Sequence, residues 1–66
     1  MNLKKAVRVG LANNDKSQED LAEYLNKSPV TVSNYMTGKT DPPFKVVCAM
    51  AEYFNLKLSD FCANGE

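Results

Sequence analysis

Signals that start and stop helices are crowded into residues 17–38, and this crowding limits the fold more than any other feature of the sequence. Ser17, followed three residues later by Asp20, is close to the capping-box pattern that opens a helix, although Asp is shorter than the usual Glu. Asn26 accepts a left-handed backbone more readily than most residues, so the chain can reverse sharply there. The first half of this stretch therefore predicts one short helix that ends at a tight turn.

A second short helix is predicted directly after this turn. Ser28 is a typical cap, and Pro29 occupies the first helical position, where its missing N–H would have no partner in any case. Gly38 supplies a left-handed stop. Val32 and Tyr35 are expected to face inward, which leaves the opposite side of this helix exposed.

Three further helices are predicted around this pair, and no strand is expected. A first helix, before the break at residues 13–15, is indicated by apolar spacing at Leu3, Ala6, Val7, Gly10 and Leu11. After the rigid Pro42-Pro43 connector, a fourth helix is predicted by a core stripe of Phe44, Val47, Met50, Ala51 and Phe54. Ser59 is expected to cap a fifth helix that turns Phe61 and Cys62 inward. The predicted fold is all-α, a compact five-helix bundle in one domain over residues 1–66.

Composition favours a globular protein of the cytoplasm. Of the 66 residues, 44% are hydrophobic and 24% are charged, which argues against disorder. No apolar run approaches the roughly 18 residues needed to cross a bilayer, and the N-terminal segment lacks the apolar core of a secretory signal. The formal net charge of zero does not by itself indicate a nucleic-acid partner, although residues 1–16 are basic and residues 17–25 are acidic.

The sequence shows no arrangement of residues for catalysis or metal binding. It has no histidine, no nucleophile paired with a base and no glycine-rich phosphate loop, so neither an enzyme nor a cofactor is expected. Cys48 and Cys62 lack the spacing of a zinc site, and four ligands are not available. Buried, reduced thiols are their expected state, and a disulfide between them is the alternative.

A resemblance to a known family is carried by the stretch SQEDLAEYLNKSPVTVSNYMTGK. Its order of glutamine, Leu-Ala, turn, capped helix and Gly-Lys is similar to the Cro and repressor type of helix-turn-helix, the Cro/C1 or XRE-like type. The likeness continues into AEYFNLKLSDFC, which is similar to that family's fourth and fifth helices. It implies a lambda-repressor-like domain with its helix-turn-helix at about residues 17–37. The implied function is a sequence-specific regulator, a phage-type, Cro-like repressor that binds double-stranded DNA at a palindromic operator as a dimer.

In this motif the second helix lies in the major groove, and its N-terminal residues face the base edges. The resemblance therefore implies base contacts by Ser28, Pro29, Val30, Ser33 and Asn34. Val30 suits a thymine methyl group, and Asn34 suits a bidentate contact to adenine. Contacts to the DNA backbone are implied for Gln18, Lys27, Thr31, Lys39 and Thr40. The alternative for Val30 and Asn34 is an exposed helix position without a partner.

A homodimer is expected at least on DNA, because one module of this size reads only a few base pairs. The contact between copies is predicted in the C-terminal region, at Leu58, Phe61 and Cys62. Completion of the monomer core by these residues is the alternative. The acidic residues of the first motif helix offer a second surface, for RNA polymerase. A different class of function is a helix-turn-helix fold used as a protein-protein interaction module, which the zero net charge favours.

Overall fold

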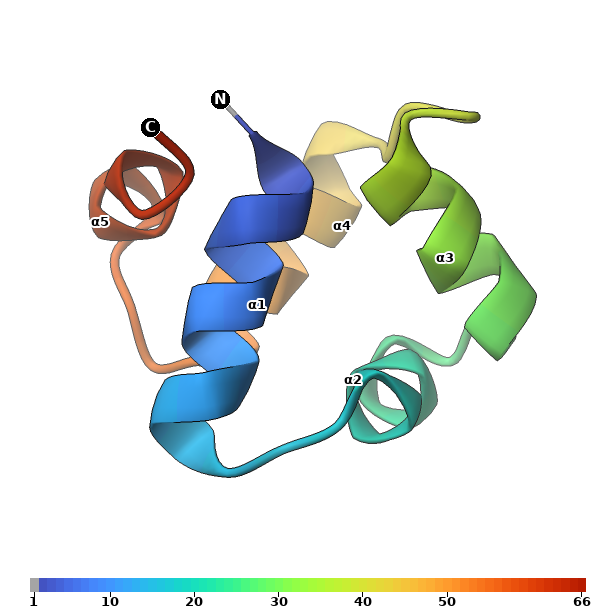
Figure 1. The fold of residues 1–66 in the computed structure, drawn as a ribbon, viewed down its shortest axis with the longest axis horizontal. Coiled ribbons are helices and arrows are strands. Elements are labelled where there is room, and N and C mark those ends of the chain that lie inside the picture. Colours follow the sequence, from blue (N-terminus) through green and yellow to red (C-terminus); the bar gives the residue numbers. More distant parts are fainter. Residues whose placement is uncertain (1) are drawn as a thin grey trace.

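The computed structural model describes residues 2–66, and these residues form five helices (Figure 1). The helices are α1 (Leu3–Asn14), α2 (Gln18–Leu25), α3 (Pro29–Thr37), α4 (Phe44–Tyr53) and α5 (Leu58–Ala63). No strand is present in the described part of the chain, so the predicted all-α class is confirmed. None of these helices has the length and apolar character that crossing a membrane requires.

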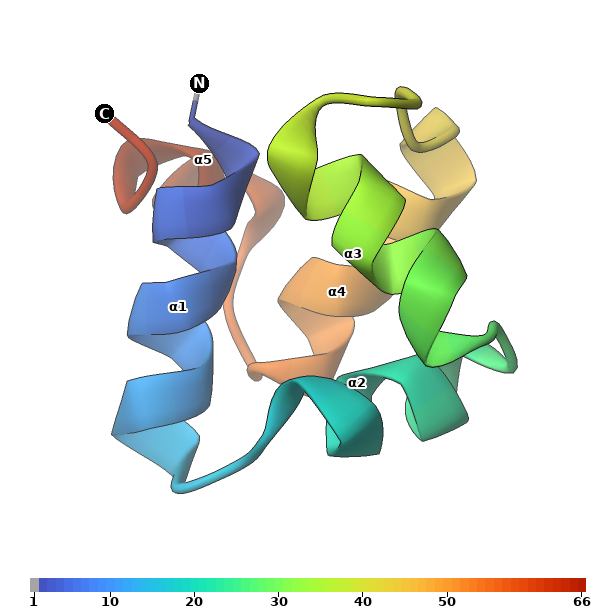
Figure 2. The same cartoon turned by 45° about the vertical axis from the view of Figure 1, so that its right-hand side comes forward.

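One core holds the five helices together. Helix α3 packs on α1 and α2, and α5 packs on α1 and α4 (Figures 1 and 2). The two ends of the described chain lie side by side, where the N–H of Asn2 donates to the carbonyl of Gly65 at 2.7 Å. The buried apolar residues come from every helix and from the residue that follows α4: Ala6, Val7, Leu21, Ala22, Val32, Val46, Met50, Ala51, Phe54 and Phe61.

The inner face of α1 is the one that its apolar spacing predicts. Ala6, Val7 and Gly10 are buried, and Leu3 packs against the core at the start of the helix. Gly10 has no side chain to hold the helix away from its neighbour, so α1 lies directly against the ring of Phe54. This close approach brings the N-terminal helix onto the end of α4.

One position of the predicted α4 stripe is wrong. Phe44 is 71% exposed, whereas Met50 and Phe54 are buried. Pro43 occupies the N-cap, so Phe44 is the first helical residue, and Val46 takes the inward place in that turn. Val46, Met50 and Phe54 then follow at intervals of four residues, which is the spacing of one helical face.

The start of α5 also differs from the prediction. Ser59 does not cap this helix, because Lys57 occupies the N-cap position and makes no side-chain cap bond. Leu58 packs against the core, and the helix therefore begins one residue before Ser59. Phe61 is fully buried, as predicted, and Cys62 is half-buried. Both cysteines of the chain are free thiols.

Candidate nucleic-acid interface

The first helix of the motif, α2, begins with a complete capping box. The hydroxyl oxygen of Ser17 accepts the N–H of Asp20 at 3.2 Å, and the Asp20 carboxylate accepts the N–H and the hydroxyl of Ser17, each at 3.0 Å. The Ser17 N–H, then the Ser17 hydroxyl and the charge of Lys16, lower the pKa of Asp20 from its ordinary value of 3.8. Gln18 follows as the first helical residue and is half-buried at the positive end of α2.

Removing the cap hydroxyl with Ser17→Ala is expected to lower the free energy of unfolding at neutral pH by about 1 kcal/mol. Part of this loss depends on pH, because the hydroxyl also stabilises the ionised form of Asp20. A lowered folded-state pKa stabilises the protein above the ordinary pKa, and this contribution is lost as the pH falls through the folded-state value. Urea unfolding at neutral pH and in acid should therefore show a smaller difference between wild type and variant in acid.

Ser59→Ala is the matched control for this experiment, because Ser59 is an exposed serine in the first turn of α5 that does not occupy the N-cap. Its free energy of unfolding should stay close to that of the wild type at every pH. A Ser17→Ala loss that is the same at neutral pH and in acid would contradict the role given to the Asp20 carboxylate.

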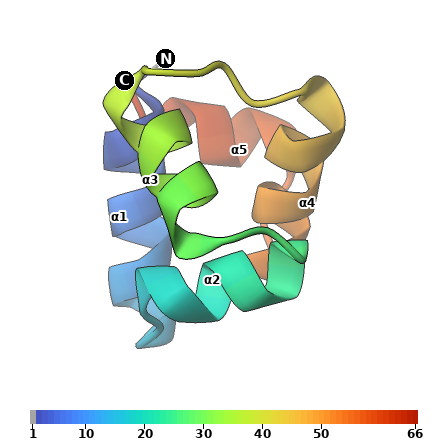
Figure 3. The ribbon, with the colours of Figure 1, turned by 90° about the vertical axis from the view of Figure 1, so that its right-hand side faces the viewer.

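The turn between α2 and α3 is as short as predicted. Asn26 has a φ of 56°, and the N–H groups of Asn26 and Lys27 donate to the carbonyls of Glu23 and Ala22 at 3.1 and 3.0 Å. Ala22 is 1% exposed, and its small side chain lets α2 and α3 approach closely. Helix α2 therefore runs across the base of α3 (Figure 3).

Both ends of α3 are stabilised by neighbouring residues. The Ser28 hydroxyl oxygen accepts the N–H of Thr31 at 3.1 Å and lies 2.8 Å from the Thr31 hydroxyl. At the other end Gly38 has a φ of 80°, and the N–H of Lys39 donates to the carbonyl of Asn34 at 3.0 Å. The predicted start and stop of this helix are confirmed.

Helix α3 has one buried and one exposed side. Val32 is fully buried, and Tyr35 and Met36 pack partly against the core. The opposite side, called the α3 face below, is formed by Pro29, Val30, Ser33, Asn34 and Thr37. Val30 is 69% exposed on it. The structure thus brings together four of the five residues predicted to contact bases, with Ser28 as the cap at their leading end.

Asn34 uses its carbonyl, and not its side chain, to end the helix. The carbonyl accepts the N–H groups of Lys39 and Thr40 at 3.0 and 3.3 Å and the hydroxyl of Thr37 at 3.4 Å. The side-chain amide has no hydrogen-bond partner within residues 2–66. A half-buried amide with both its donor and its acceptor free has the groups that a bidentate contact to adenine requires.

Thr37 belongs to the α3 face but was missed in the sequence interpretation. It is exposed one helical turn beyond Ser33 and Asn34. The bond from its hydroxyl to the Asn34 carbonyl is long, so the hydroxyl is only weakly engaged. Continuing the spacing of three and four residues past Asn34 would have found it.

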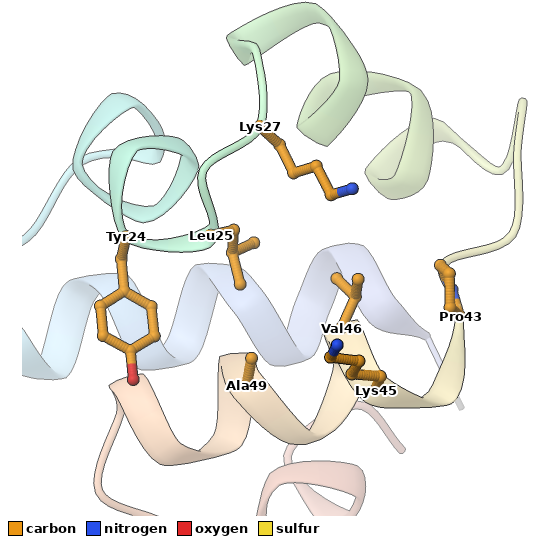
Figure 4. Close-up of a pocket in the computed structure, with 7 residues that line it drawn as sticks. All are labelled: Tyr24, Leu25, Lys27, Pro43, Lys45, Val46 and Ala49. Atoms are coloured by element: carbon orange, nitrogen blue, oxygen red, sulfur yellow. The ribbon is translucent and has the colours of Figure 1, made fainter.

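The residues predicted to contact the DNA backbone do not share one environment. Lys39 and Thr40 are exposed directly after α3, and Thr31 is half-buried with its hydroxyl beside Ser28. Lys27 differs from these because its side chain borders a hollow that is also lined by residues of α2 and α4 (Figure 4). Lys27 thus borders a second surface, which is described below, and its contact with the DNA backbone stays a prediction.

The three residues predicted to form the contact between two copies differ in how deeply they are buried. Phe61 is fully buried, and its ring stacks on Phe54 with the ring centroids 5.9 Å apart. Its place in the predicted contact is therefore wrong, and the alternative, completion of the monomer core, describes it correctly. Leu58 and Cys62 are half-buried, and their role in a dimer stays a prediction.

These features define a helix-turn-helix domain: two capped helices, a short left-handed turn, and a second helix with an exposed polar and apolar face. A comparison with known families agrees, because the family described as Helix-turn-helix matches residues 5–61. The chain belongs to the Cro/C1-type helix-turn-helix family, whose members are DNA-binding transcriptional regulators and not an enzyme class.

Two similar proteins are named as transcriptional regulators. The chain is 40% identical over 50 residues to the uncharacterized HTH-type transcriptional regulator YvzC of Bacillus subtilis, a match that covers 76% of this chain and 65% of that protein. It is 33% identical over 58 residues to the uncharacterized HTH-type transcriptional regulator MJ0272 of Methanocaldococcus jannaschii, and this match covers 88% of each chain. No solved structure matches the chain significantly.

Proposed function

We propose that this protein represses transcription in the cytoplasm by binding a palindromic operator as a homodimer, with α3 in the major groove. The observation that carries the proposal is the side chain of Asn34, which has no hydrogen-bond partner within residues 2–66 and lies one turn from the exposed Val30. An amide and an apolar side chain at this spacing fit an adenine edge and a neighbouring thymine methyl group. Lys39 and Thr40, exposed after the helix, suit contacts that fix its register on the DNA backbone.

The dimer is proposed because a single module of this size has too little contact area to select one site in a genome. Two copies related by a twofold axis would place their α3 helices in successive major grooves, about 34 Å apart. Leu58 and Cys62 offer half-buried apolar surface for the contact between copies. The bound dimer would cover a promoter, and the exposed carboxylates of Glu19 and Glu23 on α2 offer a surface to RNA polymerase.

Selection of bound sequences from a randomised duplex pool tests this proposal, followed by the mass of the complex on the selected site. Enrichment of a palindrome that binds two chains is the expected result. Enrichment of a single half-site that binds one chain would overturn the dimer. No enrichment at low salt, where electrostatic binding to DNA is strongest, would favour the use of the α3 face in protein-protein interaction.

Asn34→Ala is expected to weaken binding to the selected operator by about 1–3 kcal/mol and to relax the preference at one base pair of each half-site. The reason is that the amide can satisfy the donor and the acceptor of one adenine together. Titration against the operator and its single-base variants measures both effects. Asn13→Ala, an exposed asparagine in the last turn of α1, is the control, and an operator preference that survives Asn34→Ala would remove Asn34 from base readout.

Lys39→Ala should weaken binding to every sequence alike, because a phosphate contact carries no base information. The slope of log K against log salt should become shallower by about one unit. Binding at several salt concentrations, to the operator and to an unrelated duplex, measures this slope. Lys57→Ala, which removes an exposed lysine before α5, should leave the slope unchanged. Loss of preference at one particular base pair in Lys39→Ala would contradict a backbone role.

A further inference from the structure

A hollow of about 450 Å³ lies between the end of the helix-turn-helix and helix α4 (Figure 4). Its lining comes from the end of α2, the turn that follows and the first half of α4: Tyr24, Leu25, Lys27, Pro43, Lys45, Val46 and Ala49. None of these residues belongs to the α3 face. The hollow therefore lies outside the α3 face, and Lys27 is the one lining residue that is also predicted to contact the DNA backbone.

The floor and one wall of the hollow are apolar or aromatic. Leu25, Val46 and Ala49 meet where α2 packs on α4, and Figure 4 shows their side chains turned toward one another. Tyr24 forms the wall and is 51% exposed, one of the few large hydrophobic residues on the surface. Its ring is tilted against that of Tyr53, with the centroids 4.7 Å apart. The contact with Tyr53 favours one orientation of the exposed Tyr24 ring at the edge of the hollow.

The charged residues that line the hollow have one sign. Lys27 reaches in from the turn and Lys45 from the first turn of α4, and no acidic residue contributes to the lining. This local excess is not a property of the whole chain, whose formal net charge is zero. An apolar floor beside two ammonium groups is complementary to an apolar side chain with carboxylates on either side of it.

We propose that this hollow docks an acidic amphipathic segment of a partner protein, with an apolar side chain on the Leu25, Val46 and Ala49 floor and carboxylates at Lys27 and Lys45. Its volume falls in the range of ligand sites, but the hollow is open on one side, so it covers one face of a ligand and does not enclose a small molecule. A helix or strand that continues past the hollow suits such an open site. A nucleic-acid backbone would contact only the two ammonium groups and would leave the apolar floor uncovered.

Binding of a designed peptide in the absence of DNA tests this docking surface separately from the proposed operator binding. The probe is an acetylated, amidated helical peptide with two leucines four residues apart and glutamates around them, and the control peptide has every glutamate replaced by lysine. Amide shifts of the isotope-labelled protein map the contact. The acidic peptide should shift the signals of Tyr24, Lys27 and Ala49, and the basic peptide should not. Equal binding of both peptides, or no binding of either, would overturn the proposal.

Charge reversal at Lys45 provides a second test of the docking surface. Lys45→Glu should lower the affinity for the acidic peptide by about tenfold, because it removes one attractive charge and adds a repulsive one. Lys4→Glu makes the same change of charge on the exposed side of α1, outside the lining of the hollow, and should leave the affinity within about twofold of wild type, because salt screens exposed charges that are not in contact. Circular dichroism of both variants checks that they fold.

Two results of these variants would contradict the docking surface. An equal loss of peptide affinity in Lys45→Glu and Lys4→Glu would mean that binding depends on the overall charge of the protein and not on the hollow. A change in the mass of the peptide-free protein in Lys45→Glu, measured by sedimentation, would assign the hollow to contact between two copies of this chain and overturn the partner-protein proposal.

Discussion

Phe61→Ala is expected to lower the free energy of unfolding by about 3–5 kcal/mol, the largest effect of any single substitution considered. The side chain is fully buried, and its ring stacks on Phe54 at a centroid distance of 5.9 Å. It is also the only fully buried residue of the six-residue helix α5, so its loss would leave a cavity and release that helix from the core. A domain of this length has a total stability of roughly 3–10 kcal/mol, so the variant should be largely unfolded at moderate temperature.

Urea unfolding followed by circular dichroism measures this loss. Cys62→Ala is the matched control, because it truncates the next residue of the same helix at a half-buried position. This control should lose much less stability than Phe61→Ala. A Phe61→Ala protein that is as stable as the control but binds the operator as a monomer would contradict the place of Phe61 in the core. That result would assign Phe61 to the contact between two copies.

Gly10→Ala is expected to lower the free energy of unfolding by about 1–3 kcal/mol, although alanine is normally the better helix former. A Cβ atom added at Gly10 would lie 2.6 Å from Cδ2 and 2.7 Å from Cγ of Phe54. The ring has little room to retreat, because it is 3% exposed and lies between Tyr53 and Phe61, with centroid distances of 5.4 and 5.9 Å. The clash therefore outweighs the gain of about 0.5–1 kcal/mol in helix propensity.

A double-mutant cycle with Phe54→Leu identifies the cause of this loss. If the ring is the obstacle, Gly10→Ala should cost clearly less in the Phe54→Leu background than in the wild type, because the two sites are in direct contact. Thermal and urea unfolding of the four proteins give the coupling energy. A Gly10→Ala protein more stable than wild type would show that α1 is free to move away from Phe54.

The part of the fold that carries the candidate site was largely predictable from the sequence. The capping box at Ser17, the left-handed Asn26, the cap at Ser28 and the stop at Gly38 all occur where they are predicted. Each of these signals acts between a residue and backbone groups three or four positions away. Such contacts form inside one helix end, so neighbouring residues alone determine them.

The predictions that failed depend on packing between helices. Phe44 was placed in the core by its spacing, but α4 begins at that residue, and the inward place in the first turn belongs to Val46. Phe44 and Val46 are two residues apart, about 200° around the helix, so they cannot both face the core in this turn. Ser59 is a good cap by composition, yet Leu58 packs against the core and α5 begins there, two residues earlier than a cap at Ser59 would start it.

The sequence by itself determined the helix-turn-helix and the order of polar and apolar residues along α3, because these follow from local hydrogen bonds and helical spacing. Only the tertiary structure decided that Phe61 lies in the core and that Lys27 and Lys45, distant in the chain, border one hollow. These outcomes depend on where α2, α4 and α5 cross. Crossings are set by contacts between segments far apart in the chain, such as Gly10 with Phe54, which no local pattern records.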